Sequence, residues 1–273
     1  MKPSYWQSQT ADAPLFPDIE WSKPEQRSQA GKLLIIGGNK LGFVAVASAY
    51  ETATKAGIGE SRVALPDVLK KAIDPGAFDT VYAASNPSGG FSKEALSELK
   101  GYIGWADGLL FIGESGRNAE TAIVYEQLLN IDRPTILTRD ALDLVRTQAR
   151  QWLQNPQLCA VATFAQLQKL FQAVQYPKML LFSMQLAQLV DALHKFTITY
   201  PASIITMHHG QLIVAHDGQV STTPCDDNLI IWRGTIATRA AVYILQHPAQ
   251  RFEALTSAML LPKDGDTFAK SSV

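Results

Sequence analysis

The feature that most constrains the fold is a repeated alternation between short apolar runs and longer segments with helical periodicity. The run KLLIIGG at residues 32–38 ends in two glycines, and residues 43–59 then carry small and apolar side chains at helical spacing. Because the apolar runs show little polar alternation, they predict strands that are buried on both faces of a parallel sheet. The sequence therefore predicts an α/β fold with a doubly wound, mostly parallel central sheet and helices on both faces.

The same pattern extends along most of the chain. We expect further strands at residues 61–66, 79–85, 107–113 and 134–138, and further helices at residues 92–105, 118–130, 139–154, 164–174 and 178–196. Residues 202–223 predict a strand followed by a hairpin whose turn is Asp217-Gly218. Helices at residues 235–247 and 250–261 close the predicted fold, and the tail from Pro262 is expected to fray.

The first 30 residues differ in composition from the rest. They contain four prolines and several large apolar residues, among them Tyr5, Trp6, Phe16 and Trp21. Proline resists regular structure, whereas so many aromatic side chains would be costly in a solvated tail. We therefore expect residues 1–30 to form an extended arm that packs on its own domain or on a neighbouring subunit of a homo-oligomer. Residues 31–273 are expected to form one α/β domain.

Composition narrows the classes of partner. The 24 basic and 25 acidic residues nearly cancel and form no block of like charge, which argues against nucleic-acid and anionic-membrane partners and favours a small-molecule ligand.

The two cysteines, Cys159 and Cys225, lie far apart in the sequence, which argues against a zinc site and a disulfide framework. The sequence also lacks a signal-peptide pattern and a long apolar span, so we expect a soluble protein of a reducing cytoplasm.

Three glycine-containing turns are candidate ligand sites, because ligands of doubly wound sheets bind where strands end and helices begin. The first turn follows the first strand, the second turn follows the strand at 107–113, and the third turn opens a helix, where the helix dipole and an arginine favour a phosphate. For the first two turns, plain turn chemistry is an equally good interpretation. The candidate ligand-binding residues are Gly38, Asn39 and Lys40; Gly113, Glu114, Ser115 and Gly116; and Arg233, Gly234 and Thr235.

Acidic and histidine side chains give weaker signals. Asp140 begins a predicted helix, where a carboxylate is stabilising regardless of function, and Asp226 and Asp227 precede the third turn, where solvated turn residues are the plainer interpretation. His208 and His209 are expected to point to opposite faces of a strand and so to form a poor metal pair. We predict no metal site.

The order of these parts resembles the ribokinase-like superfamily, and most closely the ADP- or ATP-dependent NAD(P)H-hydrate dehydratases. The resemblance rests on four segments and covers about residues 31–260. These segments are GKLLIIGGNKLGFVAVASAYETATKAGIGESRVALP, WADGLLFIGESGRNAETAIVYEQLL, PTILTRDALDLV and IITMHHGQLIVAHDGQVSTT, the last of which runs into the helix at Gly234. The resemblance implies a ribokinase-like fold and a cleft for ADP or ATP with Mg²⁺.

The chain departs from this family where the chemistry would occur. The Gly-Thr-Gly-Asp motif, which builds the family's anion hole and supplies its acid/base, corresponds to Gly234-Thr235-Ile236-Ala237. Alanine cannot move a proton, and a well-placed acid or base contributes roughly two to four orders of magnitude in rate. The family's Asp-Ala-Asp-Ala-Leu element retains Asp140, whereas residues 161–166 and Met207 replace a Thr-Pro-His-Pro-Gly-Glu segment and a lysine.

These departures lead to three hypotheses. The first is a ribokinase-fold protein that has lost the family's catalysis and binds a nucleotide-like or other anionic small molecule. The second is an active dehydratase or small-molecule kinase with a relocated carboxylate, for which Asp227, Asp226 and Asp140 are the candidates. The third is a non-catalytic assembly protein whose functional part is the aromatic arm.

Overall fold

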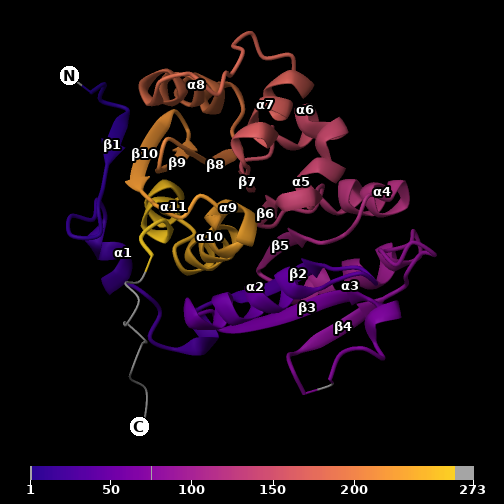
Figure 1. Cartoon of the computed structure of the whole chain (residues 1–273). Coiled ribbons are helices and arrows are strands. Elements are labelled where there is room, and N and C mark those ends of the chain that lie inside the picture. The colour runs from indigo at the N-terminus through magenta and orange to yellow at the C-terminus, as the bar shows by residue number, and fades with distance from the viewer. Residues whose placement is uncertain (1, 75, 262–273) are drawn as a thin grey trace.

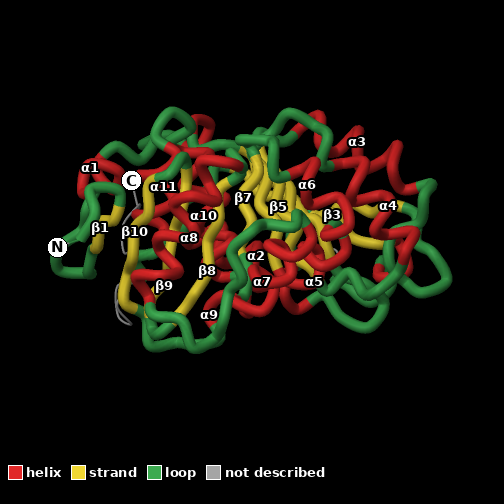
Figure 2. The backbone as a smooth tube through the Cα atoms, turned by 90° about the horizontal axis from the view of Figure 1, so that it is seen from above, coloured by secondary structure: helices red, strands yellow, loops and turns green. Residues whose placement is uncertain are grey.

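The strands of this computed structural model form one sheet that crosses the whole molecule (Figures 1 and 2). The structure describes residues 2–74 and 76–261, and the tail from Pro262, expected to fray, lies outside them. The sheet order is β1-β10-β9-β8-β7-β6-β5-β2-β3-β4. The strands are β1 Trp6–Ser8, β2 Lys32–Gly37, β3 Glu60–Pro66, β4 Thr80–Ala83, β5 Gly108–Gly113, β6 Thr135–Thr138, β7 Leu158–Val161, β8 Ser203–His208, β9 Gln211–His216 and β10 Gln219–Pro224.

The predicted parallel sheet is confirmed. All pairings from β4 through β3, β2, β5, β6 and β7 to β8 are parallel, whereas β9 is antiparallel to both β8 and β10. The expected hairpin joins β9 to β10, and its turn residues Asp217 and Gly218 both have positive φ. A second tight turn, His209-Gly210, joins β8 to β9.

Helices cover both faces of the sheet, as expected. They are α1 Pro17–Trp21, α2 Val44–Lys55, α3 Ala95–Trp105, α4 Ala119–Leu128, α5 Arg139–Leu144, α6 Ala149–Trp152, α7 Phe164–Ala173, α8 Leu186–Thr199, α9 Ile230–Arg233, α10 Thr235–Gln246 and α11 Arg251–Ala258. Alternate strand residues separate the core into two layers: Leu34 and Phe111 pack with α3 to α8, whereas Leu33 and Leu110 pack with α2, α10 and α11. Each such fully buried side chain contributes about 1.5–3 kcal/mol.

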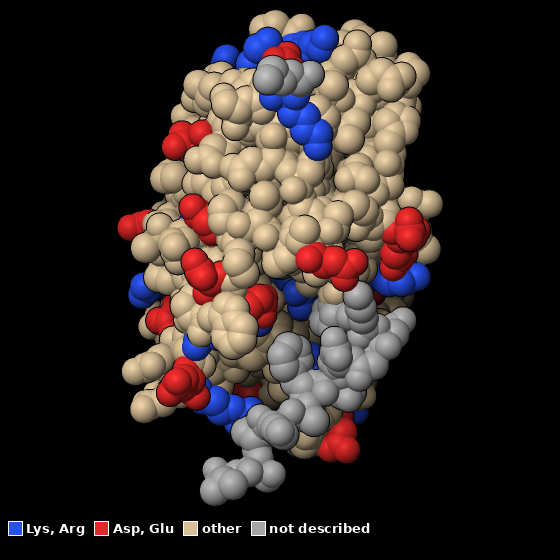
Figure 3. Space-filling view, turned by 90° about the vertical axis from the view of Figure 1, so that its left-hand side faces the viewer, with Lys and Arg blue, Asp and Glu red and all other residues tan. Residues whose placement is uncertain are grey.

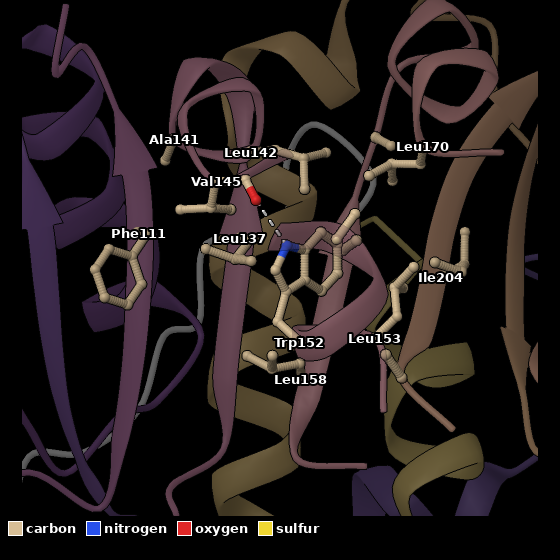
Figure 4. Close-up of a cluster of buried hydrophobic side chains, with 14 of the residues drawn as sticks. Phe111, Leu137, Ala141, Leu142, Val145, Trp152, Leu153, Leu158, Leu170 and Ile204 are labelled. Atoms are coloured by element: carbon tan, nitrogen blue, oxygen red, sulfur yellow. Dashed lines mark hydrogen bonds between the residues drawn. The ribbon is translucent and has the colours of Figure 1, made fainter. Parts of the chain in front are cut away.

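The predicted helix at residues 139–154 is broken. It consists of α5, a 3₁₀ turn at Arg146–Gln148 and α6. The carbonyl of Val145 accepts bonds from the Gln148 amide at 3.1 Å and from the Trp152 indole N–H at 3.0 Å (Figure 4). These two bonds turn the chain so that Trp152 fills the core, which helical periodicity alone does not predict.

Two further expectations need correction. The predicted helix at residues 178–196 begins only at Leu186, because Leu180 and Met184 reach the core from an irregular segment and so imitate a helical apolar pattern. Strand β7 was not identified from the sequence, because its short apolar run lacks the glycine that ends β2 and β5.

The N-terminal arm lies on its own chain. β1 pairs in parallel with β10 at one edge of the sheet, and Phe16 meets Phe252 of α11 edge to face, with ring centroids 6.0 Å apart. Gln9 is buried and donates to Thr223 Oγ1 at 2.9 Å. On this side of the molecule, Figure 3 shows acidic and basic side chains interspersed, in line with the balanced charge. None of the described helices is long and apolar enough to cross a membrane.

Candidate functional site

The first two glycine turns meet at the carboxyl ends of β2 and β5. The Gly38 amide donates to the Gly113 carbonyl at 2.9 Å, and the Asn39 side-chain amide donates to the Glu114 carbonyl. Both glycines have φ near the left-handed region, at 78° and 90°, where a side chain would be strained. Lys40 turns away from this contact, because its ammonium donates to the carbonyl of Pro87 at 3.0 Å.

The amides of the second turn hold a carboxylate of the protein itself. Asp140 accepts from the backbone N–H groups of Glu114 at 2.7 Å, Ser115 at 2.9 Å and Gly116 at 3.1 Å. Successive amides of this kind form a concavity that favours an anion. Asp140 therefore occupies the position that an anionic ligand would take in this turn, and it reaches there from the start of α5.

Glu114 and Arg139 connect the second turn to its surroundings. Both have left-handed backbones, with φ of 57° and 55°, and their side chains form an ion pair at 3.4 Å that is 23% and 12% exposed. The other oxygen of Glu114 accepts the Ala45 amide at 2.9 Å, at the start of α2. A non-glycine left-handed residue costs about 1–3 kcal/mol, and such strain concentrates at functional sites.

Arg139 also reaches the third turn. Its Nη1 donates to the Trp232 carbonyl at 2.8 Å, and the guanidinium lies over the Trp232 indole at 4.9 Å from the ring centroid. Among the described residues, its buried Nε has no hydrogen-bond partner. The structure thus joins the second and third turns through one arginine that was not among the residues predicted from the sequence.

The third turn keeps its shape but has no carboxylate. Gly234 has φ of 84°, and a Cβ there would lie 2.6 Å from Ile112 Cδ1. The helix that follows, α10, has no acidic residue in its first turn and no side-chain cap, and Ile236 and Ala237 are fully buried. The opening of α10 therefore lacks a side chain that can transfer a proton.

The two other acidic candidates lie before this turn. Asp227 forms an ion pair with Arg233 at 2.6 Å and accepts the Leu229 amide at 3.0 Å. Arg233 is 58% exposed, and Asp226 is exposed. Asp227 and Arg233 therefore form a partly exposed ion pair just before the start of α10.

Beside the second and third turns lies a hollow of about 380 Å³, which we call the cleft hollow. It is lined by Arg117, Asp140, Asp143, Leu144, Arg146, Lys169 and Trp232. Asp143 pairs with Arg146 at 3.4 Å and with Lys169 at 3.9 Å, whereas Arg117 forms no ion pair among the described residues. The hollow thus combines excess positive charge with an indole ring that is half exposed.

Sequence reasoning identified only Asp140 among these lining residues. Arg117 directly follows the second turn, and its position was the one available signal. The segment at residues 161–166 also reaches this region: Gln166 caps α7 together with Thr163 and donates to the Arg139 carbonyl at 2.7 Å. Where the resemblance implies a histidine and a carboxylate, this chain thus has a neutral, structural amide.

Behind the second turn, the hydroxyls of Ser115 and Tyr125 form a buried hydrogen-bonded pair. Ser115 Oγ and the Tyr125 hydroxyl lie 2.6 Å apart, and Tyr125 is fully buried. Burial raises the pKa of Tyr125, since the charged phenolate would be desolvated. Both hydroxyls therefore stay neutral and hold the second turn in place.

The histidine prediction requires a correction in its premise. His209 leaves the strand with φ of 47°, so the rings of His208 and His209 lie 4.0 Å apart rather than on opposite faces. Both Nε2 atoms contact the Met184 carbonyl, at 2.8 and 3.1 Å, and burial lowers the pKa of His208. Within the described part of the chain, no group of three or more His, Cys, Asp or Glu residues could hold a metal.

Comparison with known proteins identifies the fold. No protein-family model and no curated protein matches the sequence. A ribokinase-like superfamily protein from Enterococcus faecalis superposes with a TM-score of 0.69 at 15% identity, over 94% of this chain and 87% of that chain. A hypothetical protein from Streptococcus mutans gives 0.64 at 16% identity, over 88% and 84%.

A third similar structure is the ADP/ATP-dependent NAD(P)H-hydrate dehydratase from Bacillus subtilis, co-crystallised with ATP and Mg²⁺. It gives a TM-score of 0.61 at 12% identity, over 90% of this chain and 85% of that chain. The predicted ribokinase-like fold is confirmed, as is the resemblance of this chain to NAD(P)H-hydrate dehydratases. At these identities the similarity extends to the fold and not to an activity.

Proposed function

We propose that this chain is a ribokinase-fold protein without the family's catalysis, and that its cleft hollow binds a nucleotide-like anionic small molecule. The observation that carries the proposal is the lining of the hollow, which combines the half-exposed indole of Trp232 with three cations, against the carboxylates of Asp140 and Asp143. The cations are Arg117, Arg146 and Lys169. An indole face stacks on a planar ring, and guanidinium groups bind phosphate oxygens. A hollow of about 380 Å³ falls within the range of small-molecule sites.

The engagement of three carboxylates around the turns supports the non-catalytic part of the proposal, whereas Asp226 is exposed to solvent. A general base must be within hydrogen-bond reach of the proton that it takes. Asp140 is engaged by three amides, Glu114 by the start of α2 and by Arg139, and Asp227 by Arg233. Ala237 occupies the position that the resemblance assigns to the acid/base.

The proposed ligands are ADP or ATP, with or without Mg²⁺, because a protein with the same fold was co-crystallised with ATP and Mg²⁺. The test is a thermal-shift screen followed by isothermal titration with ADP, ATP, AMP, NADH and NADPH, with and without Mg²⁺. A ligand that binds only the folded state raises the melting temperature by mass action. We expect at least one nucleotide to bind.

Substitutions in the cleft hollow test whether the nucleotide binds there. Arg117→Ala and Trp232→Ala should each weaken the affinity about tenfold, which corresponds to about 1.4 kcal/mol. Lys100→Ala, an exposed lysine on α3 away from the cleft hollow, should leave it unchanged. Absence of binding by every nucleotide would overturn the ligand-binding proposal. Turnover of hydrated NADH or NADPH that Asp227→Asn abolishes, with the melting temperature unchanged, would instead establish the active enzyme with a relocated carboxylate.

A further inference from the structure

A second hollow, larger than the cleft hollow, lies near the amino ends of the strands, whereas the glycine turns lie at their carboxyl ends. Its volume is about 570 Å³. It is lined by Arg150, Val174, Gln175, Tyr176, Pro177, Lys178, Asp191, Ala192, Lys195, Thr199 and Tyr200. Because α6 precedes β7 and α8 precedes β8, these residues meet near the amino ends of those strands, away from the glycine turns. We call it the α8 hollow, and none of the candidate site residues lines it.

The α8 hollow carries excess positive charge. Arg150, Lys178 and Lys195 line it against the single carboxylate of Asp191. That carboxylate already pairs with Lys195 at 2.8 Å and accepts the Tyr5 hydroxyl of the arm at 3.3 Å. Among the described residues, neither Arg150 nor Lys178 forms an ion pair, and both are exposed to solvent within reach of a ligand. Two cations therefore remain available for an anion.

One wall of the α8 hollow is aromatic and well packed. Tyr176 and Tyr200 have ring centroids 6.5 Å apart, and both contact Phe196, at 5.1 and 4.9 Å. Tyr200 and Val174 are buried. A wall that is held by a cluster of rings does not need to be ordered by the ligand, which lowers the entropic cost of binding.

We infer that the α8 hollow is a second binding site, for a small phosphate monoester that carries an aromatic group. Its phosphate lies between Arg150 and Lys178, and its ring lies against Tyr176. A phosphate monoester carries nearly two negative charges at neutral pH, which matches the two unpaired cations. The volume suits a small molecule and is too small for a folded partner. This site is independent of the function proposed for the cleft hollow.

The test uses isothermal titration of the full-length protein with phenyl phosphate, inorganic phosphate and phenol as probes. Because charge and ring act together, phenyl phosphate should bind at least about tenfold more tightly than either of the other two. Arg150→Ala and Lys178→Ala should each weaken phenyl phosphate binding about tenfold. Both side chains are exposed, so both variants should fold, as unchanged circular dichroism and melting temperature would verify.

Two comparisons keep this site distinct from the cleft hollow. Lys100→Ala, which lines neither hollow, should leave phenyl phosphate binding unchanged, and Arg117→Ala, which lines the cleft hollow, should weaken it less than Arg150→Ala does. No binding of phenyl phosphate at millimolar concentration would overturn the inference. It would also be overturned if phenyl phosphate bound no better than inorganic phosphate, or if Arg117→Ala and not Arg150→Ala weakened the binding.

Discussion

The turn after β5 and the start of α10 differ in one respect that decides their chemistry. Both present backbone amides at the carboxyl edge of the sheet, and both contain a left-handed glycine, Gly113 and Gly234. The turn after β5 holds a carboxylate, because three of its amides donate to Asp140. The start of α10 has no acidic side chain in its first turn.

This difference shows that the backbone conformation of an anion site can be present without the side chain that performs its chemistry. At the turn after β5, a protein carboxylate satisfies the amides, so the conformation is stable without a ligand. At α10 the backbone shape persists through Gly234, while Ile236 and Ala237 contribute only to the core. A motif can therefore keep the geometry of its turn after losing the side chain that carried its chemistry.

The largest expected effect on stability tests whether Asp140 stabilises the turn after β5. Asp140→Ala should lower the free energy of unfolding by about 3 kcal/mol, because three amides lose a charged acceptor. Urea denaturation measures this loss. Asp143→Ala is the matched control on the same helix. It removes two partly exposed ion pairs and a bond from the Gln166 amide, which keeps its bond to the Arg139 carbonyl, and should cost about 1 kcal/mol. Equal losses in the two variants would show that Asp140 does not stabilise the turn.

A smaller effect tests the shape of the third turn. Gly234→Ala should destabilise the fold by about 2–3 kcal/mol, because alanine is strained at positive φ and its Cβ would meet Ile112. Gly101→Ala on α3 should have the opposite sign and stabilise by about 0.5–1 kcal/mol, since no atom lies within 4 Å of the added Cβ. Melting temperatures of both variants provide the comparison; a neutral Gly234→Ala would mean that the turn tolerates a side chain.

The smallest expected effect on stability measures the backbone strain at Arg139, the residue that joins the second and third turns. Arg139→Gly and Arg139→Ala both remove the ion pair with Glu114 and the bond to the Trp232 carbonyl. Glycine adopts the φ of 55° without strain, so Arg139→Gly should be more stable than Arg139→Ala by about 1 kcal/mol. Denaturation of the two variants under identical conditions measures the difference. The reverse order would indicate that loss of unfolded-chain entropy outweighs the strain.

Much of the fold followed from local patterns. Apolar runs that end in glycine located β2 and β5, and the Asp217-Gly218 turn located the hairpin of β9 and β10. The break after α5 was not predictable, because it depends on the indole of Trp152 reaching the Val145 carbonyl. The irregular segment before α8 was missed for a similar reason, since its apolar residues pack in the core without being helical.

The candidate site was only partly predictable. The three turns were identified from glycines next to strands and helices, and the missing carboxylate at Ala237 is visible in the residue itself. The lining of the cleft hollow comes from separate segments, at Arg117, Lys169 and Trp232, and no local pattern links these positions. The role of Arg139 was equally hidden, because its contacts lie with Glu114 and Trp232 in other segments.

By itself, the sequence determined the order of most strands and helices, the positions of the glycine turns and the absence of an acid at the start of α10. These properties depend on neighbouring residues and on side-chain chemistry that each position carries with it. Only the tertiary structure decided that Asp140 fills the turn after β5, that Arg139 joins the second and third turns, and that basic side chains gather in two hollows. Such contacts depend on how the sheet brings distant segments together, and hydrogen bonds and ion pairs act only at short range.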